Sequence, residues 1–357
     1  MLSYRKLAMR VLGRPLNTGG GISQTRPLSQ RAAALTLTAA LLTGAAFPAF
    51  AGTYYIENGD IVISAGTETG TNKVEQGGTL KSENDKGTII TNHDKDKASS
   101  NTVTIDANGK NDKVEVTLKD VNIDASRGSE AAVSVTGKGD TTIELDGDNE
   151  LKSGAGHAGL EHNKTDTSGE LTIQDKDNNG SLEAAGGFKG AGIGSAGSND
   201  AQVKITGGNI TATTSDDWGA GIGSGSYGTG TVEITGGEIN ATGGYLGAGI
   251  GGGCNGSGNV TISGGTITAA GSDGAAGIGG GYYNGATVTI TGDAVIKNAS
   301  STKYGAGIGG GNGSDGNVTI SGNAKIENAT GGYGAAGIGG GAFSSPDKIG
   351  NGNVVIK

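Results

Sequence analysis

The chain has few of the residues that build disulfide frameworks, metal centres or catalytic triads. Cys254 is the only cysteine among 357 residues, so no internal disulfide can form. Three histidines are present, and no serine, histidine and aspartate set stands out, so a hydrolase triad is not expected. Cys254 lies between Gly253 and Asn255, in a turn-like stretch. It is interpreted as a small turn residue, the alternative being a disulfide to a second molecule.

Arginine is almost absent from the greater part of the chain. Arg127 is the only arginine after residue 51. Residues 52–357 keep all 35 acidic side chains but only 20 of the 26 basic ones, a formal charge of about −15. Such a surface repels nucleic acid and anionic membranes and attracts cations. Nucleic acid is therefore not an expected partner.

Helical spacing of apolar residues is also missing after residue 51. Hydrophobic residues make up 33% of the chain and aromatic residues 4%, which is little for one large round core. Glycine is abundant, with 74 residues, but it shows no Gly-X-Y period, so collagen is excluded. This composition fits a narrow core that is shared among stacked units.

Residues 1–51 have the layout of a secretory signal peptide with a long basic region. Six basic residues and no acidic residue occur in this segment, and an apolar run covers residues 32–46. Ala49-Phe50-Ala51 then places small residues at the positions that precede a cleavage site. We expect a secreted or cell-surface protein without membrane insertion after cleavage. An uncleaved membrane anchor is the alternative, although the run is shorter than the ~20 residues of a membrane span.

One phrase, Ala-Gly-Ile-Gly or a close variant of it, occurs six times in the second half of the chain. The isoleucines at its centre are separated by 29, 28, 28, 30 and 30 residues, and they are listed here: Ile193, Ile222, Ile250, Ile278, Ile308 and Ile338. A constant period in this range indicates a repeat architecture in which one unit is stacked on the next. Glycine permits positive φ and has no side chain, so we expect a tight turn or close backbone approach at this phrase.

Each repeat contains short stretches that alternate apolar and polar residues. In one unit, Val260, Ile262, Ile267 and Ile278 would point inward, while threonines such as Thr261 would point outward. Stacking each residue over its counterpart, at the ~4.8 Å strand spacing, explains why identical residues recur at identical positions. The predicted fold is an all-β, right-handed parallel β-helix with coils of about 28–30 residues.

The clarity of the repeat divides the chain into segments. We expect residues 52–100 to form an irregular start or cap and residues 101–185 to form degenerate coils. The regular Gly-rich coils would occupy residues 186–357. The sequence stops within the first strand of a further unit, at 353–357, from which we expect a missing cap or a truncated reading frame.

Aromatic residues recur four or five residues before the repeated isoleucine. The five residues are Phe188, Trp218, Tyr245, Tyr304 and Tyr333. In stacked coils their side chains would form a column that could bind the C–H faces of a sugar chain. The alternative is an aromatic ladder that only anchors loops. A less regular second set follows the Gly-rich turns: Tyr227, Tyr282, Tyr283 and Phe343.

A second candidate site is a calcium loop. Asp175, Asp177 and Asn179, followed by Gly180, match the first half of a D-x-D-x-N-G loop, in which oxygen ligands two residues apart converge on one cation. The twelfth position is Gly186 rather than the usual glutamate. The alternative is a polar turn between two strands.

Three further patterns are weaker. Residues 192–197 fit G-x-G-x-x-G, but no helix follows, so a dinucleotide site is not expected. His157 and His162 flank Gly159-Leu160-Glu161 in an expected loop, where metal binding is the less favoured interpretation. Outward threonines recur and are compatible with ice binding, but Lys204 and Glu233 interrupt the series.

The strand-rich half of the chain resembles a known family. Residues 114–123, together with residues 171–173 and 181–184, are similar to bacterial secreted carbohydrate-binding proteins of the polysaccharide-lyase-like β-helix type. The similarity covers roughly residues 55–357 and is carried by repeat character. It implies a right-handed parallel β-helix that binds plant-type polysaccharide, often with calcium, and has little or no lyase activity. Asp175, Asp177 and Asn179 are the positions that it implies as calcium ligands.

These observations favour a secreted, non-catalytic protein that binds polysaccharide along one face. A surface adhesin or structural passenger domain, in which the coils serve as a spacer, is the first alternative. A calcium-dependent polysaccharide lyase is the second, with Arg127 as base beside a calcium ion that neutralises the sugar carboxylate.

Overall fold

Strands account for nearly all regular structure in the computed structural model, which describes residues 51–214, 218–343 and 349–357. In these ranges the only helical turn is the 3-10 helix η1 (Ile56–Asn58), in keeping with the missing helical periodicity. No helix among these residues is long and apolar enough to cross a membrane. The predicted signal peptide, up to residue 50, lies outside the described residues.

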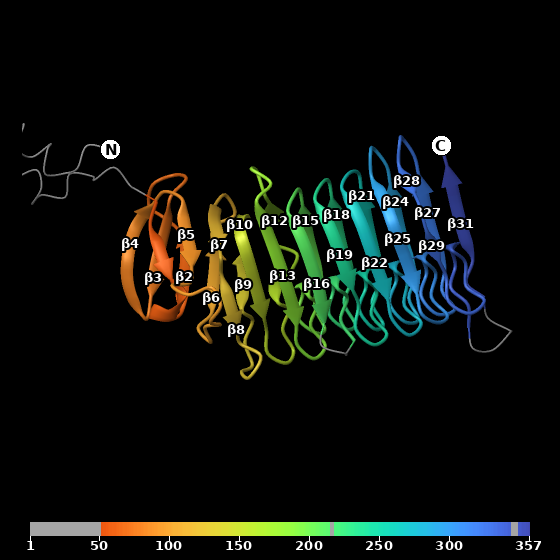
Figure 1. Ribbon diagram of the computed structural model, residues 1–357, viewed down its shortest axis with the longest axis horizontal. Helices are drawn as coiled ribbons and strands as arrows, with labels where there is room; N and C mark the ends of the chain where they lie inside the picture. The colour runs from red at the N-terminus through yellow and green to blue at the C-terminus, as the bar shows by residue number, and fades with distance from the viewer. Residues whose placement is uncertain (1–50, 215–217, 344–348) are drawn as a thin grey trace, which may run out of the picture. The chain divides into compact units, whose positions relative to one another are not determined.

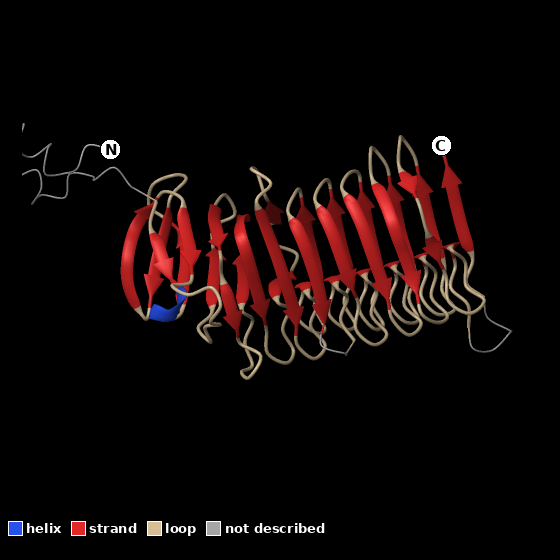
Figure 2. Cartoon of the chain, viewed as in Figure 1, coloured by secondary structure: helices blue, strands red, loops and turns tan. Residues whose placement is uncertain are grey.

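The strands belong to three sheets, A, B and C, in which most pairs are parallel, and each regular coil visits them in the order A, C, B. Figures 1 and 2 show the strands of successive coils side by side. Sheet A contains β1 (Thr53–Tyr55), β5 (Thr88–Thr91), β7 (Lys113–Lys119), the first half of β10 (Asp140–Lys152), β12 (Leu171–Gln174), β15 (Asp200–Ile205), β18 (Gly230–Ile234), β21 (Gly258–Ile262), β24 (Ala286–Ile290), β27 (Gly316–Ile320) and β31 (Gly352–Ile356). Sheet C contains β8 (Asn122–Asp124), the second half of β10, β13 (Gly180–Gly186), β16 (Asn209–Thr214), β19 (Glu238–Thr242), β22 (Thr266–Gly271), β25 (Val295–Ser301), β28 (Lys325–Ile326) and β29 (Ala329–Thr330). Sheet B contains β2 (Ile61–Ala65), β3 (Asn72–Gln76), β4 (Thr79–Asp85), β6 (Val103–Ala107), β9 (Val133–Gly137), β11 (Leu160–Lys164), β14 (Ile193–Gly194), β17 (Ile222–Gly223), β20 (Ile250–Gly251), β23 (Ile278–Gly279), β26 (Ile308–Gly309) and β30 (Ile338–Gly339).

Equivalent residues of successive coils lie directly beside one another. In sheet B, Ile222 pairs with Ile250 and Ile250 pairs with Ile278, and the same register continues through Ile308 to Ile338. This register confirms the stacking that the period predicted. Each coil supplies hydrogen bonds to the next, so the backbone groups of a coil are satisfied by its neighbours.

Alternation along the strands places the core inside the coils. Val260, Ile262, Ile267 and Ile278 are each at most 2% exposed, as predicted, whereas Thr261 is exposed. Removing such side chains from water stabilises the fold by roughly 25 cal/mol for each Å² of apolar surface. The core is therefore a continuous stack of aliphatic side chains that runs through the coils.

The glycines of the repeated phrase allow the coils to approach closely. Gly279 has φ +139°, and a Cβ atom placed on it would lie 2.0 Å from the carbonyl oxygen of Gly309 in the next coil. Gly251 shows the same geometry against Gly279. Only glycine tolerates this approach together with a positive φ, which confirms the expectation for this phrase.

Residues 52–100 contain more strands than the sequence indicated. The sequence indicates short extended pieces at residues 53–56, 60–64 and 88–91, and these correspond to β1, β2 and β5. The strands β3 and β4 were not predicted, because their polar sequences do not alternate. β2 pairs antiparallel with β3 and parallel with β6 of the first coil, and β3 pairs antiparallel with β4. This meander extends sheet B away from the first coil.

Candidate functional site

The five predicted aromatic residues occupy two adjacent columns, not one. Phe188, Tyr245 and Tyr333 lie five residues before the isoleucine of their coil, whereas Trp218 and Tyr304 lie four before it. The backbone conformation differs between these two positions. In several coils the residue four before the isoleucine has a positive φ, as Trp218 does at 39°, so its side chain leaves the backbone in another direction than that of its neighbour. The prediction of a single column was therefore wrong in its register, although all five side chains lie along the same loops.

Phe188, Trp218 and Tyr227 form a cluster with Lys189, which we call the N-terminal aromatic cluster. The ring centroids of Phe188 and Trp218 are 5.8 Å apart, and those of Trp218 and Tyr227 are 6.5 Å apart in an edge-to-face arrangement. The Lys189 Nζ atom lies 5.1 Å from the Phe188 ring and 5.2 Å from the Trp218 ring, a cation–π geometry. Phe188 is nevertheless 42% exposed.

The second aromatic set belongs to the same edge of the coils. The loop after the repeated isoleucine is tied to the loop before it by backbone hydrogen bonds: Ser226 N–H donates to the Lys189 carbonyl at 2.9 Å, and Tyr282 N–H donates to the Leu246 carbonyl at 3.0 Å. The two loops therefore form one edge, which we call the aromatic edge. It carries Phe188, Trp218, Tyr227, Tyr245, Tyr282, Tyr283, Tyr304, Tyr333 and Phe343. Tyr227, Tyr282, Tyr283 and Phe343 each lie four or five residues after a repeated isoleucine. This spacing could have revealed the second set from the sequence.

A second group of rings, the C-terminal aromatic cluster, lies farther along this edge. It consists of two groups of contacting rings, Tyr282 with Tyr283 and Phe343, and Tyr304 with Tyr333. The Tyr304 and Tyr333 ring centroids are 6.4 Å apart, and Tyr333 is 72% exposed. Tyr282 donates a hydrogen bond from its hydroxyl to that of Tyr283 at 2.8 Å. Burial and this contact raise the pKa of the Tyr282 hydroxyl.

Tyr245 lies between the two clusters, beside an ion pair. Lys303 Nζ is 2.8 Å from Asp273 Oδ2. The hydrogen bond and charge of Asp273 raise the pKa of the Lys303 ammonium, with smaller contributions from Tyr245 and Tyr304. The ammonium charge is therefore balanced locally.

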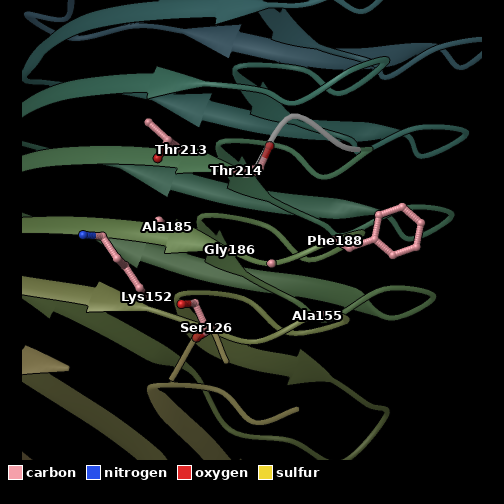
Figure 3. Close-up of a pocket in the computed structure, with 10 residues that line it drawn as sticks. Ser126, Lys152, Ala155, Ala185, Gly186, Phe188, Thr213 and Thr214 are labelled. Carbon is pink, nitrogen blue, oxygen red and sulfur yellow. The ribbon is translucent and has the colours of Figure 1, made fainter. Parts of the chain in front are cut away.

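A cavity of about 370 Å³ opens beside the N-terminal aromatic cluster. It is lined by Ser126, Lys152, Thr213 and Phe188, among others, and Figure 3 shows Lys152 and Phe188 at opposite ends of it. The ammonium of Lys152 forms an ion pair with Glu150. The cavity thus offers hydroxyl groups and one aromatic wall next to the exposed rings.

The predicted calcium ligands form a turn in which the carboxylates already have partners. Asp175 accepts hydrogen bonds from the backbone N–H groups of Asn179, at 3.1 Å, and Gly180, at 3.0 Å. Asn179 donates its side-chain amide to Asp177 at 3.0 Å. This arrangement is that of a polar turn with an aspartate cap, the alternative raised from the sequence.

In the structure, Glu144 from the preceding coil lies beside two of the predicted calcium ligands, Asp175 and Asp177. One carboxylate oxygen each of Glu144, Asp175 and Asp177 lies within 4.8 Å of the others. Three carboxylates are suitable ligands for a hard cation, but Lys176 Nζ lies 3.6 Å from Glu144 Oε2 and supplies a positive charge there. The amide nitrogen of Asn179 faces Asp177. Glu144 lies about one coil before Asp175, a spacing that could have revealed it.

Arg127 lies far from these carboxylates. It follows β8, whereas Asp175 and Asp177 precede β13, and both strands pair with the second half of β10 in sheet C. Arg127 and the two aspartates therefore lie beyond opposite ends of a strand as long as β13. Its seven residues span about 20 Å at the usual strand rise. Arg127 and the carboxylates Asp175 and Asp177 thus lie at opposite ends of the strands of sheet C, whereas the expected lyase mechanism requires an arginine beside the calcium ligands.

The remaining polar candidates serve the fold. His157 Nδ1 is 2.8 Å from Glu161 Oε2, while both ring nitrogens of the buried His162 face backbone carbonyls. Burial lowers the pKa of the His162 imidazole. Cys254 is 3% exposed, and burial raises the pKa of its thiol to about 11, which opposes a disulfide to a second molecule.

The outward threonines form a true ladder on sheet A. Thr261 pairs with Thr289, and Thr289 pairs with Thr319. In the same column, Lys204 and Glu233 form an ion pair with a distance of 3.3 Å between Nζ and Oε1. The charged pair interrupts the threonine series, as the sequence indicated.

Comparison with known proteins agrees with this geometry. The family model described as beta helix repeat matches residues 203–226, 232–254, 260–282 and 318–342. The protein is a parallel β-helix. The matched description names a structural repeat, so it bears on the fold of the β-helix and not on a ligand. Searches of curated proteins and of solved structures gave no significant match.

Proposed function

We propose that this β-helix binds polysaccharide through its aromatic edge, without catalysing a reaction. One observation carries the proposal: nine of the eleven aromatic residues that follow residue 51 lie on this single edge. An aromatic ladder that only anchored loops would have its rings buried. Tyr227, Tyr245, Tyr283 and Tyr333 are instead about half exposed or more.

The chemistry of the edge fits a sugar ligand. Aromatic rings offer large, rigid apolar faces, and tyrosine adds a polar hydroxyl at the rim. Sugar rings have C–H groups on their faces and hydroxyls around them, so both parts find complementary groups. Because the rings are attached to a stack of hydrogen-bonded coils, little conformational entropy is lost when a ligand binds.

The proposed setting is outside the cell, either secreted or at the cell surface. This part of the proposal rests on the basic and apolar pattern of residues 1–51. A surface adhesin remains the alternative, in which the β-helix holds another part of the protein away from the cell. Fractionation of the source cells, with an antibody against the β-helix, tests the location independently of the ligand.

A pull-down with insoluble polysaccharides tests the binding itself. We expect wild-type protein to sediment with at least one polysaccharide, and the double variant Phe188→Ala, Trp218→Ala to remain largely in solution. Tyr55→Ala is the matched control, because Tyr55 stacks on His93 within residues 52–100, away from the edge. Equal sedimentation of the double variant and the wild type would contradict the proposed site.

A further inference from the structure

We infer that the aromatic edge takes one extended, uncharged glycan chain, which lies along the β-helix axis and contacts both aromatic clusters at once. The inference rests on the proposed function and adds the orientation, the minimal length and the charge class of the ligand. It is argued from the spacing of the rings, their tilt and the charges beside them.

The spacing of the rings sets the orientation and the length. From the coil of Ile193 to that of Ile338 the ladder takes five steps, through Ile222, Ile250, Ile278 and Ile308. At the usual strand spacing these steps amount to about 24 Å. Phe188 lies at one end of this distance and Tyr333 at the other, with Tyr245 between them. A ligand that contacts all three must run along the axis.

The tilt of the rings favours a single chain over a flat crystalline surface. The planes of Phe188 and Trp218 differ by 43°, and those of Tyr304 and Tyr333 differ by 57°. Rings tilted in this way do not share one plane, so they cannot all lie flat on a crystal face. A free glycan chain can rotate about its glycosidic bonds and offer a differently oriented sugar face to each ring.

The charges beside the rings favour an uncharged glycan. The ammonium of Lys189 lies over the Phe188 and Trp218 rings, and that of Lys303 is paired with Asp273. The cavity lysine, Lys152, is paired with Glu150. Since residues 52–357 carry a formal charge of about −15, a polyanionic glycan would be repelled without a compensating cluster of cations.

Contact with two clusters has a quantitative consequence. Once one cluster holds the chain, the second binding event is intramolecular, and the combined affinity exceeds that of either cluster alone by at least about 100-fold. Short oligosaccharides reach only one cluster and gain nothing from the other. Two ladder steps, about 10 Å, separate the coil of Ile222 from that of Ile278, where the second cluster begins. Affinity should therefore rise as the chain lengthens from about 10 Å to the full 24 Å or so of the edge, and change little beyond it.

Titration calorimetry with oligosaccharides of increasing length tests the inference. We would use uncharged gluco-, xylo- and manno-oligosaccharides from disaccharide to octasaccharide, and oligogalacturonates of the same lengths as the charged comparison. We expect on the order of 100-fold tighter binding of the long members of one uncharged series, with little dependence on salt. Tighter binding of the galacturonates, weakened by salt, would overturn the charge assignment.

Two double variants separate the clusters. Both Phe188→Ala, Trp218→Ala and Tyr304→Ala, Tyr333→Ala should reduce the affinity for the longest oligosaccharide to that of a short one, while Tyr55→Ala leaves the length dependence unchanged. Circular dichroism and thermal melts confirm that each variant is folded. If one cluster alone accounts for the affinity at every length, the two-cluster inference is wrong but the proposed function stands. If no oligosaccharide and no polysaccharide binds the wild type, the proposed function fails as well.

Discussion

Phe343 stacks on Tyr283 although the two residues lie two coils apart. Their ring centroids are 5.8 Å apart and their planes differ by 28°. The coil between them has Gly313 at the corresponding position, and a Cβ atom there would lie 2.9 Å from the Phe343 ring. The missing side chain of Gly313 therefore makes room for a contact between residues that are 60 positions apart.

Replacing Gly313 should separate these two rings. In Gly313→Ala the new methyl group displaces the Phe343 ring, and the positive φ of 62° adds about 1–2 kcal/mol of strain. We expect the near-ultraviolet circular dichroism of the aromatic residues to change. Phe343→Ala is the control, since it should alter the spectrum in the same way without backbone strain. An unchanged spectrum in both variants would show that the rings do not stack.

The isoleucine ladder should carry much of the stability of each coil. Ile250 is completely buried and pairs with isoleucines on both sides. Ile250→Ala should lower the free energy of unfolding by about 2–5 kcal/mol, because the cavity extends into both neighbouring coils. Thr289→Ala, on the outer face of sheet A, should change it by no more than about 0.5 kcal/mol. Chemical denaturation of both variants checks the difference.

The glycines of the repeated phrase should be intolerant of any side chain. Gly279→Ala combines a positive φ with a clash against the next coil, whereas Gly70 has φ +73° but no atom near its missing Cβ. We expect Gly70→Ala to cost about 1–2 kcal/mol, from the backbone conformation alone. Gly279→Ala should cost clearly more or prevent folding. Equal melting temperatures for the two variants would contradict the close approach of the coils.

The buried thiol predicts a specific pH dependence. The pKa of Cys254 is about 11 in the folded protein, above its ordinary value of 9.0, because burial disfavours the thiolate. The unfolded chain thus loses its proton first as pH rises. The contribution of the thiol to stability is complete below pH 9 and is lost as pH rises through 11.

Other groups also titrate in this pH range, so the contribution of Cys254 is obtained by comparing the wild type with a variant that lacks the thiol. The difference in unfolding free energy between wild type and Cys254→Ala should decline from pH 8 to pH 11. The native protein should also react slowly with thiol reagents at neutral pH and rapidly in denaturant. Rapid labelling of the native protein would show that the thiol is accessible.

Asp175 should stabilise its turn without any metal ion. Its two carboxylate oxygens accept backbone N–H groups of Asn179 and Gly180. Asp175→Ala should therefore cost about 1–3 kcal/mol in the presence of a chelator, whereas Asp175→Asn, which keeps one acceptor oxygen, should cost less. Calcium binding stays a prediction. A rise in melting temperature on adding calcium, abolished in Glu144→Gln, would support it.

Strong local signals made most of the fold predictable. The period of 28–30 residues and the alternation around Val260 and Ile262 predict stacked coils with an aliphatic interior, and the register confirms this. β3 and β4 were missed because their pairing is antiparallel and their side chains are polar, so they lack both repeat and alternation.

The candidate site was predictable only in part. The recurrence of aromatic residues before Ile193 and its counterparts indicated an aromatic face. The sequence did not reveal that Phe188 and Trp218 occupy different columns, because φ reverses sign where the chain turns. Nor did it show that Arg127 and the carboxylates lie at opposite ends of sheet C, since the length of a strand separates them.

The sequence by itself determined the repeating unit, its interior residues and the stacking register, because a period-two pattern within a constant coil length leaves one way to bury the aliphatic side chains. Only the tertiary structure decided which loops share an edge. That decision depends on hydrogen bonds between coils, such as that from Ser226 to Lys189, which bring together residues from separate parts of the chain. The aromatic edge exists because of these contacts.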